Sequence, residues 1–246
     1  MRLNHLQWRV VGATMCVCVF VALGGGCSAI LSRPAPSSLY QLHYRPQPIP
    51  CAATLPASVR IWPLEASPPY DQEALVVVAT DARVRYSSQY SWVAQPGKMV
   101  SEWLTRDLSQ TRLFPSVMTA GEHFAESYDL GGHLFVFAWQ GTQDRWQAVL
   151  EAEITLVANR SMQGRQIVLR KPYRMVGESV RENDAEALAA AMSRLVADLS
   201  AALQQDLCAA AIANQAVRTG PTSPLAHPLV SIQLDSLVPG HSLDRR

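Results

Sequence analysis

Cys27 is the residue whose surroundings point most directly to covalent chemistry. It follows three consecutive glycines and the uncharged, largely apolar stretch Val10–Leu23, with Arg2 and Arg9 further upstream. A basic start, an apolar segment and small residues beside the cleavage point are typical of secretory signals. When a cysteine is the first residue after the cut, its thiol accepts a diacylglycerol. The pattern therefore predicts a lipoprotein signal peptide over residues 1–26 and a lipid on Cys27.

Two alternatives remain open for this segment. Ordinary cleavage would leave Cys27 as a free thiol, and an uncleaved anchor has enough length because Val10–Ser32 is uncharged and a membrane span takes about 20 residues. Glycine costs about 1 kcal/mol relative to alanine in a helix interior, so the glycines favour cleavage. Lipidation is the preferred interpretation, although Gly24 occupies a position that is usually leucine. Since Ser28 and not aspartate follows Cys27, the expected location is the outer membrane, facing the periplasm.

Cys51 and Cys208 are the cysteines that remain for other chemistry, because Cys16 and Cys18 lie in the signal segment. An oxidising compartment favours one intramolecular disulfide between them. The alternative is two unpaired buried thiols, since free cysteine packs as a small hydrophobe. A bridge would join the N-terminal segment to the last predicted helix.

The rest of the sequence carries no pattern typical of a catalytic, metal or cofactor site. None of the histidines that follow Cys27 lies three or four residues from another, the spacing of many metal sites. Glu151 and Glu153 share a strand face with Gln147 and Thr155, which favours a solvated face over an acid–base pair. A formal net charge of +1 gives no electrostatic basis for nucleic-acid binding. The sequence therefore predicts a protein that is not an enzyme.

Three aromatic residues form the remaining candidate site. Tyr86, Tyr90 and Trp92 lie close together before the first predicted helix. Tyrosine and tryptophan are over-represented where proteins contact partners or lipid. The competing interpretation, which the sequence favours, is that these rings cover the edge of the domain's own core.

The elements that position these residues follow from hydrophobic periodicity. Six prolines between residues 28 and 57 predict an extended tether over 27–57, with a short strand possible around Tyr40. A folded domain is expected over 58–212. Alternating or continuous apolar runs predict strands, and Pro96 opens an amphipathic pattern that predicts a helix to about Arg112. The expected strands before and after this helix are Val59–Trp62, Ala74–Ala79, Val84–Tyr86, Tyr90–Val93 and Phe114–Met118.

A three-stranded meander and a long helix complete the predicted domain. The strands are expected over 133–140, 146–156 and 166–178. In the first, Leu134 and Phe137 are expected on opposite faces, both covered. Asn183 with Glu186 would cap the final helix, whose apolar stripe runs from Leu188 to Leu207.

The opposite side of this helix is expected to face away from the sheet and carries Ser193, Ser200, Gln204 and Gln205. Residues 213–246 are predicted to be mostly disordered. The fold class is therefore α+β, with a mixed, mainly antiparallel sheet and two helices packed on one face.

With the cysteine motif in place, a longer pattern resembles a known family. The residues that carry the resemblance are Pro68-Pro69-Tyr70-Asp71, Ala74-Leu75-Val76, Tyr86, Tyr90, Trp92, Pro96, Leu104 and Leu113-Phe114. They are similar to those of ABC-type transport auxiliary lipoproteins, which include the lipoprotein of the paraquat-inducible, MCE-type system. The resemblance covers about 60 residues, and the order of elements continues to match through the last helix.

The resemblance implies a non-enzymatic outer-membrane lipoprotein that works with an inner-membrane ABC transporter. Its expected partner is a periplasmic MCE-domain protein that carries lipids or other hydrophobic molecules, and homo-oligomer formation is a further expectation. The alternative is an envelope-assembly lipoprotein that binds an outer-membrane protein or peptidoglycan. A periplasmic hydrolase is disfavoured because no catalytic pattern is found.

Overall fold

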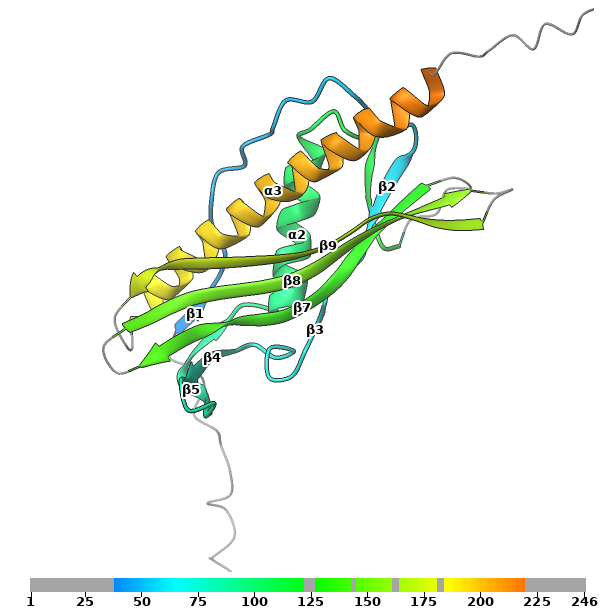
Figure 1. Ribbon diagram of the computed structural model, residues 1–246. Coiled ribbons are helices and arrows are strands. Elements are labelled where there is room, and N and C mark those ends of the chain that lie inside the picture. Colours follow the sequence, from blue (N-terminus) through cyan, green and yellow to red (C-terminus); the bar gives the residue numbers. More distant parts are fainter. Residues whose placement is uncertain (1–37, 122–126, 143–144, 161–163, 181–183, 220–246) are drawn as a thin grey trace, which may run out of the picture.

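A computed structural model of the chain describes residues 38–121, 127–142, 145–160, 164–180 and 184–219 (Figure 1). The predicted signal peptide, Cys27 and Asn183 lie outside the described residues, as does the chain beyond Thr219. The predictions of the signal peptide and of the lipid on Cys27 therefore stay predictions.

The sheet is built around the long strand β7 (Ser127–Thr142). It pairs antiparallel with β8 (Arg145–Arg160), which pairs antiparallel with β9 (Gly164–Val180). The predicted meander is therefore present, with strands longer than their apolar runs suggested.

Shorter strands extend the sheet from the other edge of β7. Strands β2, β3 and β4 run parallel to β7, β6 runs parallel to β2, and β5 joins β4 antiparallel and β1 in parallel. Their bounds are β1 (Ser38–Tyr40), β2 (Ser58–Ile61), β3 (Glu65–Ala66), β4 (Ala74–Ala79), β5 (Val84–Trp92) and β6 (Val117–Thr119). The two strands expected between Val84 and Val93 are one strand.

A β-bulge at Phe135 changes the faces predicted for β7. Leu134 is opposite Ala152 and Val136 is opposite Glu151, so Phe135 is an extra residue without a partner across the ladder. An extra residue shifts the alternation of all side chains that follow. Leu134 and Phe137 are both buried on the helix side, so the expectation of opposite faces was wrong, and Phe135 is 46% exposed on the other face.

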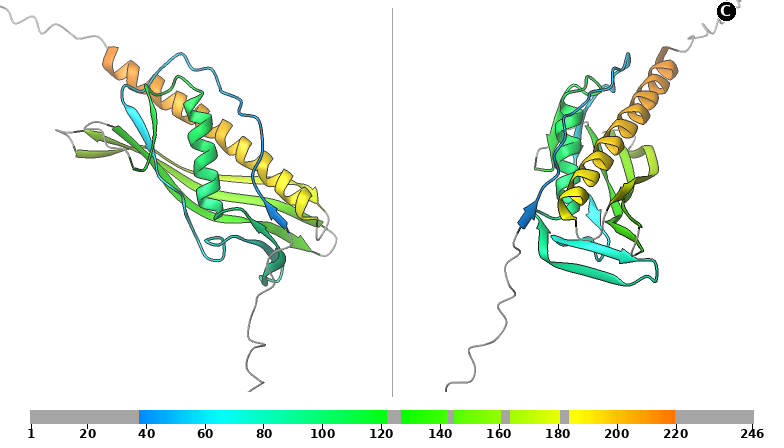
Figure 2. Two further views of the ribbon diagram at one scale, coloured as in Figure 1. Left: turned by 180° about the vertical axis from the view of Figure 1, so that it is seen from behind. Right: turned by 90° about the vertical axis from the view of Figure 1, so that its left-hand side faces the viewer.

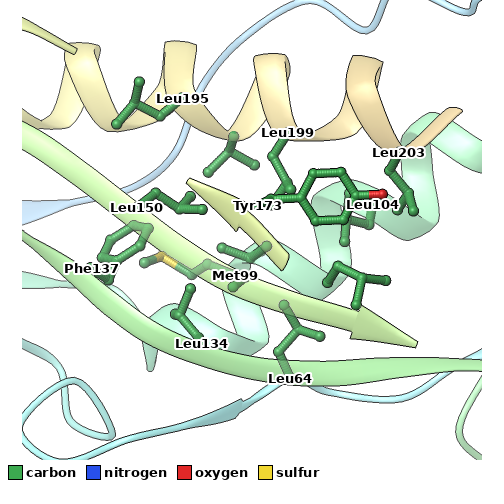
Figure 3. Close-up of a cluster of buried hydrophobic side chains, with 14 of the residues drawn as sticks. Leu64, Met99, Leu104, Leu134, Phe137, Leu150, Tyr173, Leu195, Leu199 and Leu203 are labelled. Atoms are coloured by element: carbon green, nitrogen blue, oxygen red, sulfur yellow. The ribbon is translucent and has the colours of Figure 1, made fainter. Parts of the chain in front are cut away.

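Both helices, α2 (Pro96–Ser109) and α3 (Ala185–Thr219), lie on the same face of the sheet (Figure 2). The predicted α+β class, with a mixed and mainly antiparallel sheet, is confirmed. Buried leucines from the helices and sheet meet between these layers, together with Met99, Phe137 and Tyr173 (Figure 3). We call this helix-covered side the inner face and the opposite side, turned to the viewer in Figure 1, the outer face.

The ends of α3 differ from the sequence predictions. The backbone N–H of Ala187 donates to Asp184 Oδ1 at 2.9 Å, so Asp184 provides the N-cap interaction that had been assigned to Asn183. With Asp184 as the N-cap, Ala187 is the third residue of the helix. Glu186 is therefore not at the position that a capping box requires. At the other end, α3 continues to Thr219, so residues 213–219 are helical and not part of a disordered tail.

The first turn of α2 fits closely against the chain before β3, which gives a testable prediction. A Cβ at Gly97 would overlap the carbonyl oxygen of Leu64. Gly97→Ala should therefore lower the free energy of unfolding by about 2 kcal/mol, although alanine favours helices. Urea denaturation measures this change, and Gly121→Ala is the control because nothing lies within 4 Å of its added Cβ. Equal stability of the two variants would contradict the predicted close fit.

Candidate functional site

The segment from Gln41 to Ala57, which we call the strap, crosses the helices on the side away from the sheet (Figure 2). Leu42, Ala53 and Leu55 are at most 2% exposed and belong to the main core. The N–H of Leu55 also donates to the carbonyl oxygen of Leu113 at 2.7 Å. The folded domain was expected to begin at 58, but residues 38–57 of the predicted tether already pack on it, because apolar residues between the prolines are buried in the core.

Polar residues of α3 hold the strap along its length. The N–H of His43 donates to Ser193 Oγ at 2.9 Å, and the N–H of Ile49 donates to Gln204 Oε1 at 2.9 Å. Ser193, Ser200 and Gln204 are at most 4% exposed. Except at Gln205, which is exposed, this side of α3 therefore faces the strap, and it satisfies backbone donors of a segment that has no regular secondary structure.

A disulfide joins the strap to α3 covalently. Cys51 and Cys208 are bonded, with their Cα atoms 5.8 Å apart. Together with Ser193, Ser200 and Gln204, Cys208 continues one line along the helix at spacings close to whole turns. Of the two alternatives left open by the sequence, the structure contains the bonded pair.

A compact cluster of charged and aromatic groups ties the strap to α2 as well. Tyr44 stacks on Trp103 with ring centroids 4.3 Å apart, and its hydroxyl donates to Asp107 Oδ2 at 2.6 Å. The guanidinium of Arg106 lies 3.2 Å from the centroid of the Trp103 ring and donates to the carbonyl oxygen of Tyr44 at 3.0 Å. The Arg106 cation over the Trp103 ring and the hydrogen bond from the Tyr44 hydroxyl to the Asp107 carboxylate hold the strap in one position.

The phenol of Tyr44 gives this cluster a pH dependence. Burial, followed by the hydrogen bond to the Asp107 carboxylate, raises the pKa of Tyr44 well above its usual value of 10.0. A raised pKa means that the folded state keeps the proton where the unfolded state loses it. This contribution to stability is complete below pH 10 and falls as the pH rises above 10.

Tyr44→Phe should therefore lower the free energy of unfolding by about 1–2 kcal/mol at pH 7, since Asp107 loses its donor while buried. The difference from wild type should shrink above pH 10. Urea denaturation at pH 7 and at pH 10.5 measures both effects, and Tyr86→Phe, on an exposed side chain, is the control. A constant difference at both pH values would contradict the protonation argument.

The structure separates the three aromatic residues for which the sequence favoured a cover over the core edge and left a partner surface as the alternative. Trp92 is 2% exposed and contacts Phe137 with ring centroids 5.3 Å apart, so it belongs to the core. Tyr90 is half-buried and contacts Tyr40 edge-on at 5.9 Å. Tyr86 is 47% exposed. Of the three, Tyr86 is the residue that offers most of its ring to a partner.

A shallow groove of about 210 Å³ lies beside Tyr86 and Tyr90, between β4 and β5. It opens because residues 87–90 of β5 have Leu75 alone opposite them in the ladder. The N–H groups of Gln89 and Tyr90 turn back to Ser87 Oγ, at 3.2 and 2.9 Å. Trp139 and Leu75 line the groove, although both are at most 3% exposed.

The acidic pair of β8 has the solvated role that the sequence favoured. Glu151 Oε1 accepts from Arg174 at 2.6 Å and Glu153 Oε1 accepts from Arg170 at 2.8 Å, both on β9. His133 shares a 2.6 Å hydrogen bond with Ser67. Within the described part of the chain, no group of three or more His, Cys, Asp or Glu side chains is placed to hold a metal ion.

α3 also meets the length and composition criteria for a membrane span over Ala185–Ala216. Its leucines from Leu188 to Leu207 are nevertheless buried within the domain, as Figure 3 shows for Leu195, Leu199 and Leu203. The composition of α3 is therefore accounted for by a helix packed between the sheet and the strap.

Comparison with known families assigns the chain. The sequence model described as "ABC-type transport auxiliary lipoprotein component" matches residues 40–204. The chain belongs to this family of ABC-type transport auxiliary lipoproteins. The match begins at Tyr40, the last residue of β1, and ends within α3, so it includes the strap, α2, strands β2 to β9 and the part of α3 up to residue 204.

Solved structures share the fold of this auxiliary lipoprotein domain. A Xanthomonas campestris protein of the DUF330 family is 16% identical, with a TM-score of 0.62, over 74% of this chain and 100% of that protein. A second structure, of an uncharacterized protein, is 15% identical, with a TM-score of 0.53, over 70% of this chain and 99% of its own. No match was found among curated proteins.

Proposed function

We propose that this protein is a non-enzymatic, outer-membrane lipoprotein that assists an ABC transporter in moving lipids or other hydrophobic molecules across the periplasm. The observation that carries the proposal is the family match over residues 40–204, which makes the chain an auxiliary component of an ABC transport system. Its expected partner is a periplasmic MCE-domain protein, as the sequence resemblance implies.

The attachment of the domain supports a positioning role. Lipidated Cys27 would fix the chain to the membrane, and the bridge between Cys51 and Cys208 fixes the strap to α3. Any force on the anchor would then reach the helices through the disulfide and the hydrogen bonds of the strap. Such a connection suits a component that holds a partner at a set distance from the membrane.

Deletion of the gene tests the proposed role in transport. The deletion strain should become more permeable to lipophilic compounds, because lipid transport maintains the outer membrane, and the wild-type gene should restore the barrier. Uptake of a hydrophobic fluorescent dye by intact cells provides the measurement. Normal permeability and lipid composition in the deletion strain would contradict the transport role, and loss of one outer-membrane protein would favour the alternative of envelope assembly.

A further inference from the structure

Exposed apolar side chains gather on the outer face at one end of the sheet. Leu39 is 61% exposed, Val93 is 48%, Tyr86 is 47% and Val84 is 43%. We call these four residues the β1–β5 patch. Large exposed apolar clusters on soluble domains mark contact with another protein or with a membrane.

Strand register places the members of the patch on one side of the sheet. Leu39 is opposite Ser91, which lies two residues before Val93 and is also opposite Ala74. Further along β4, Val76 is two residues from Ala74 and lies opposite Tyr86. Val78 is four residues from Ala74 and lies opposite Val84. Because residues two apart on a strand share a face, all four patch residues lie on one side. Trp92, between Ser91 and Val93, is buried against Phe137 on the helix side, so the patch points away from the helices.

The patch also adjoins the point where the described chain begins. β1 starts at Ser38, and Leu39 is the next residue. Only residues 28–37 separate Ser38 from Cys27, and an extended chain of this length reaches at most about 40 Å. The lipid anchor therefore attaches to this end of the domain. The start of β9 lies at the opposite end, because it pairs with the end of β8, which pairs with the start of β7.

The chemistry of this end suits a lipid surface. Tyrosine combines an apolar ring with a polar hydroxyl and is enriched at membrane interfaces, and aliphatic side chains enter the boundary between headgroups and acyl chains. Arg83, at the turn between β4 and β5, has a side chain that is 80% exposed, although it pairs with Asp81. Long basic side chains of this kind reach phosphate groups at the bilayer surface.

We propose that the β1–β5 patch rests on the headgroup region of the membrane, so that the domain contacts the bilayer instead of only being tethered to it. This inference depends on the lipid at Cys27 that the proposed function includes. It goes further because it assigns a lipid-binding surface and fixes the orientation of the domain, with β5 against the bilayer.

Fluorescence quenching of the full-length, lipidated protein tests the contact. The variants Y86C and I167C each receive one environment-sensitive dye and are placed in vesicles of phosphatidylethanolamine and phosphatidylglycerol that contain spin-labelled lipid. Ile167 is the control because it is 58% exposed, on the outer face, near the start of β9. We expect quenching at least twofold stronger for the label in Y86C than in I167C.

Two results would overturn the contact. Equal quenching at both positions in vesicle-bound protein would show that the domain is not held against the bilayer by this patch. A dye in Y86C that is buried but not quenched by lipid would indicate a protein partner or second copy there. Mass spectrometry of the N-terminal peptide is a separate measurement, because an unmodified Cys27 would overturn the anchor itself.

Discussion

Replacing both Cys51 and Cys208 with serine is expected to lower the free energy of unfolding by about 4 kcal/mol. The bridge closes a loop between residues that are 157 positions apart, and the chain-entropy model assigns about 4–5 kcal/mol to a loop of that length. Serine removes the covalent bond with little change in side-chain volume. Urea denaturation of the oxidised wild type and of the double variant measures the difference.

The reduced wild type is the matched control for this prediction, since it loses the same bond without a substitution. Its stability should equal that of the double variant. Hydrogen exchange should also accelerate at the strap, above all at the N–H of Ile49. This residue lies two positions before Cys51, and its N–H donates to Gln204. A loss below 1 kcal/mol, with unchanged exchange at Ile49, would show that the non-covalent contacts of the strap suffice.

Cys27→Ser is expected to release the protein from the membrane almost completely. The thiol is the proposed acceptor of the diacylglycerol, and serine cannot form the thioether. The domain should still fold, because the family match and the described structure both lie beyond residue 37. Fractionation of cell envelopes, followed by detection of the protein in membrane and soluble fractions, measures the result.

The control for Cys27→Ser is the double variant of Cys51 and Cys208, which should stay with the membrane while losing stability. Incorporation of a clickable fatty acid should disappear in Cys27→Ser and persist in the double variant. Membrane retention of Cys27→Ser would contradict the lipid anchor and support an uncleaved N-terminal segment.

The elements with strong periodicity were predictable from the sequence. β4 spans Ala74–Ala79 as its continuous apolar run predicted, and α2 starts at Pro96, where proline's fixed φ suits a first helical turn. The meander was also visible because apolar and polar residues alternate along most of β8, with Val149 and Val157 as the exceptions. In each case a local pattern of one period decides the structure.

The bulge at Phe135 was not predictable from alternation. Apolar residues occupy both sides of the predicted strand, so a shift of one position leaves a pattern that still reads as a buried strand. The faces are decided by pairing with β8, where Leu134 and Phe137 meet Ala152 and Leu150. Such tertiary pairing is not encoded in the spacing of one strand.

The strap was the larger error, and part of its signal was present in the sequence. Prolines correctly predicted the absence of regular hydrogen bonding, but a segment without regular structure can still be buried. Ser193, Ser200, Gln204 and Cys208 recur on one side of α3 at near-helical spacing. A cysteine on a polar stripe indicates that another segment lies there, which is the information that would have placed the strap.

The burial of the three aromatic residues was predictable only in part. Tyr86 is exposed, whereas Trp92 is in the core because β5 lies between β1 and β4, and a contact role for Tyr86 stays a prediction. Leu39 and Val93 were not recognised, since their common face depends on parallel pairing of β1 with β5. A segment read as tether gives no reason to expect that pairing.

In-cell crosslinking followed by purification of the tagged full-length protein tests the central claim most directly. The account predicts that an MCE-domain protein, together with its ABC permease, is recovered from wild-type cells and is strongly reduced with Cys27→Ser. Recovery of an outer-membrane assembly protein or peptidoglycan in place of these transport components would contradict the account.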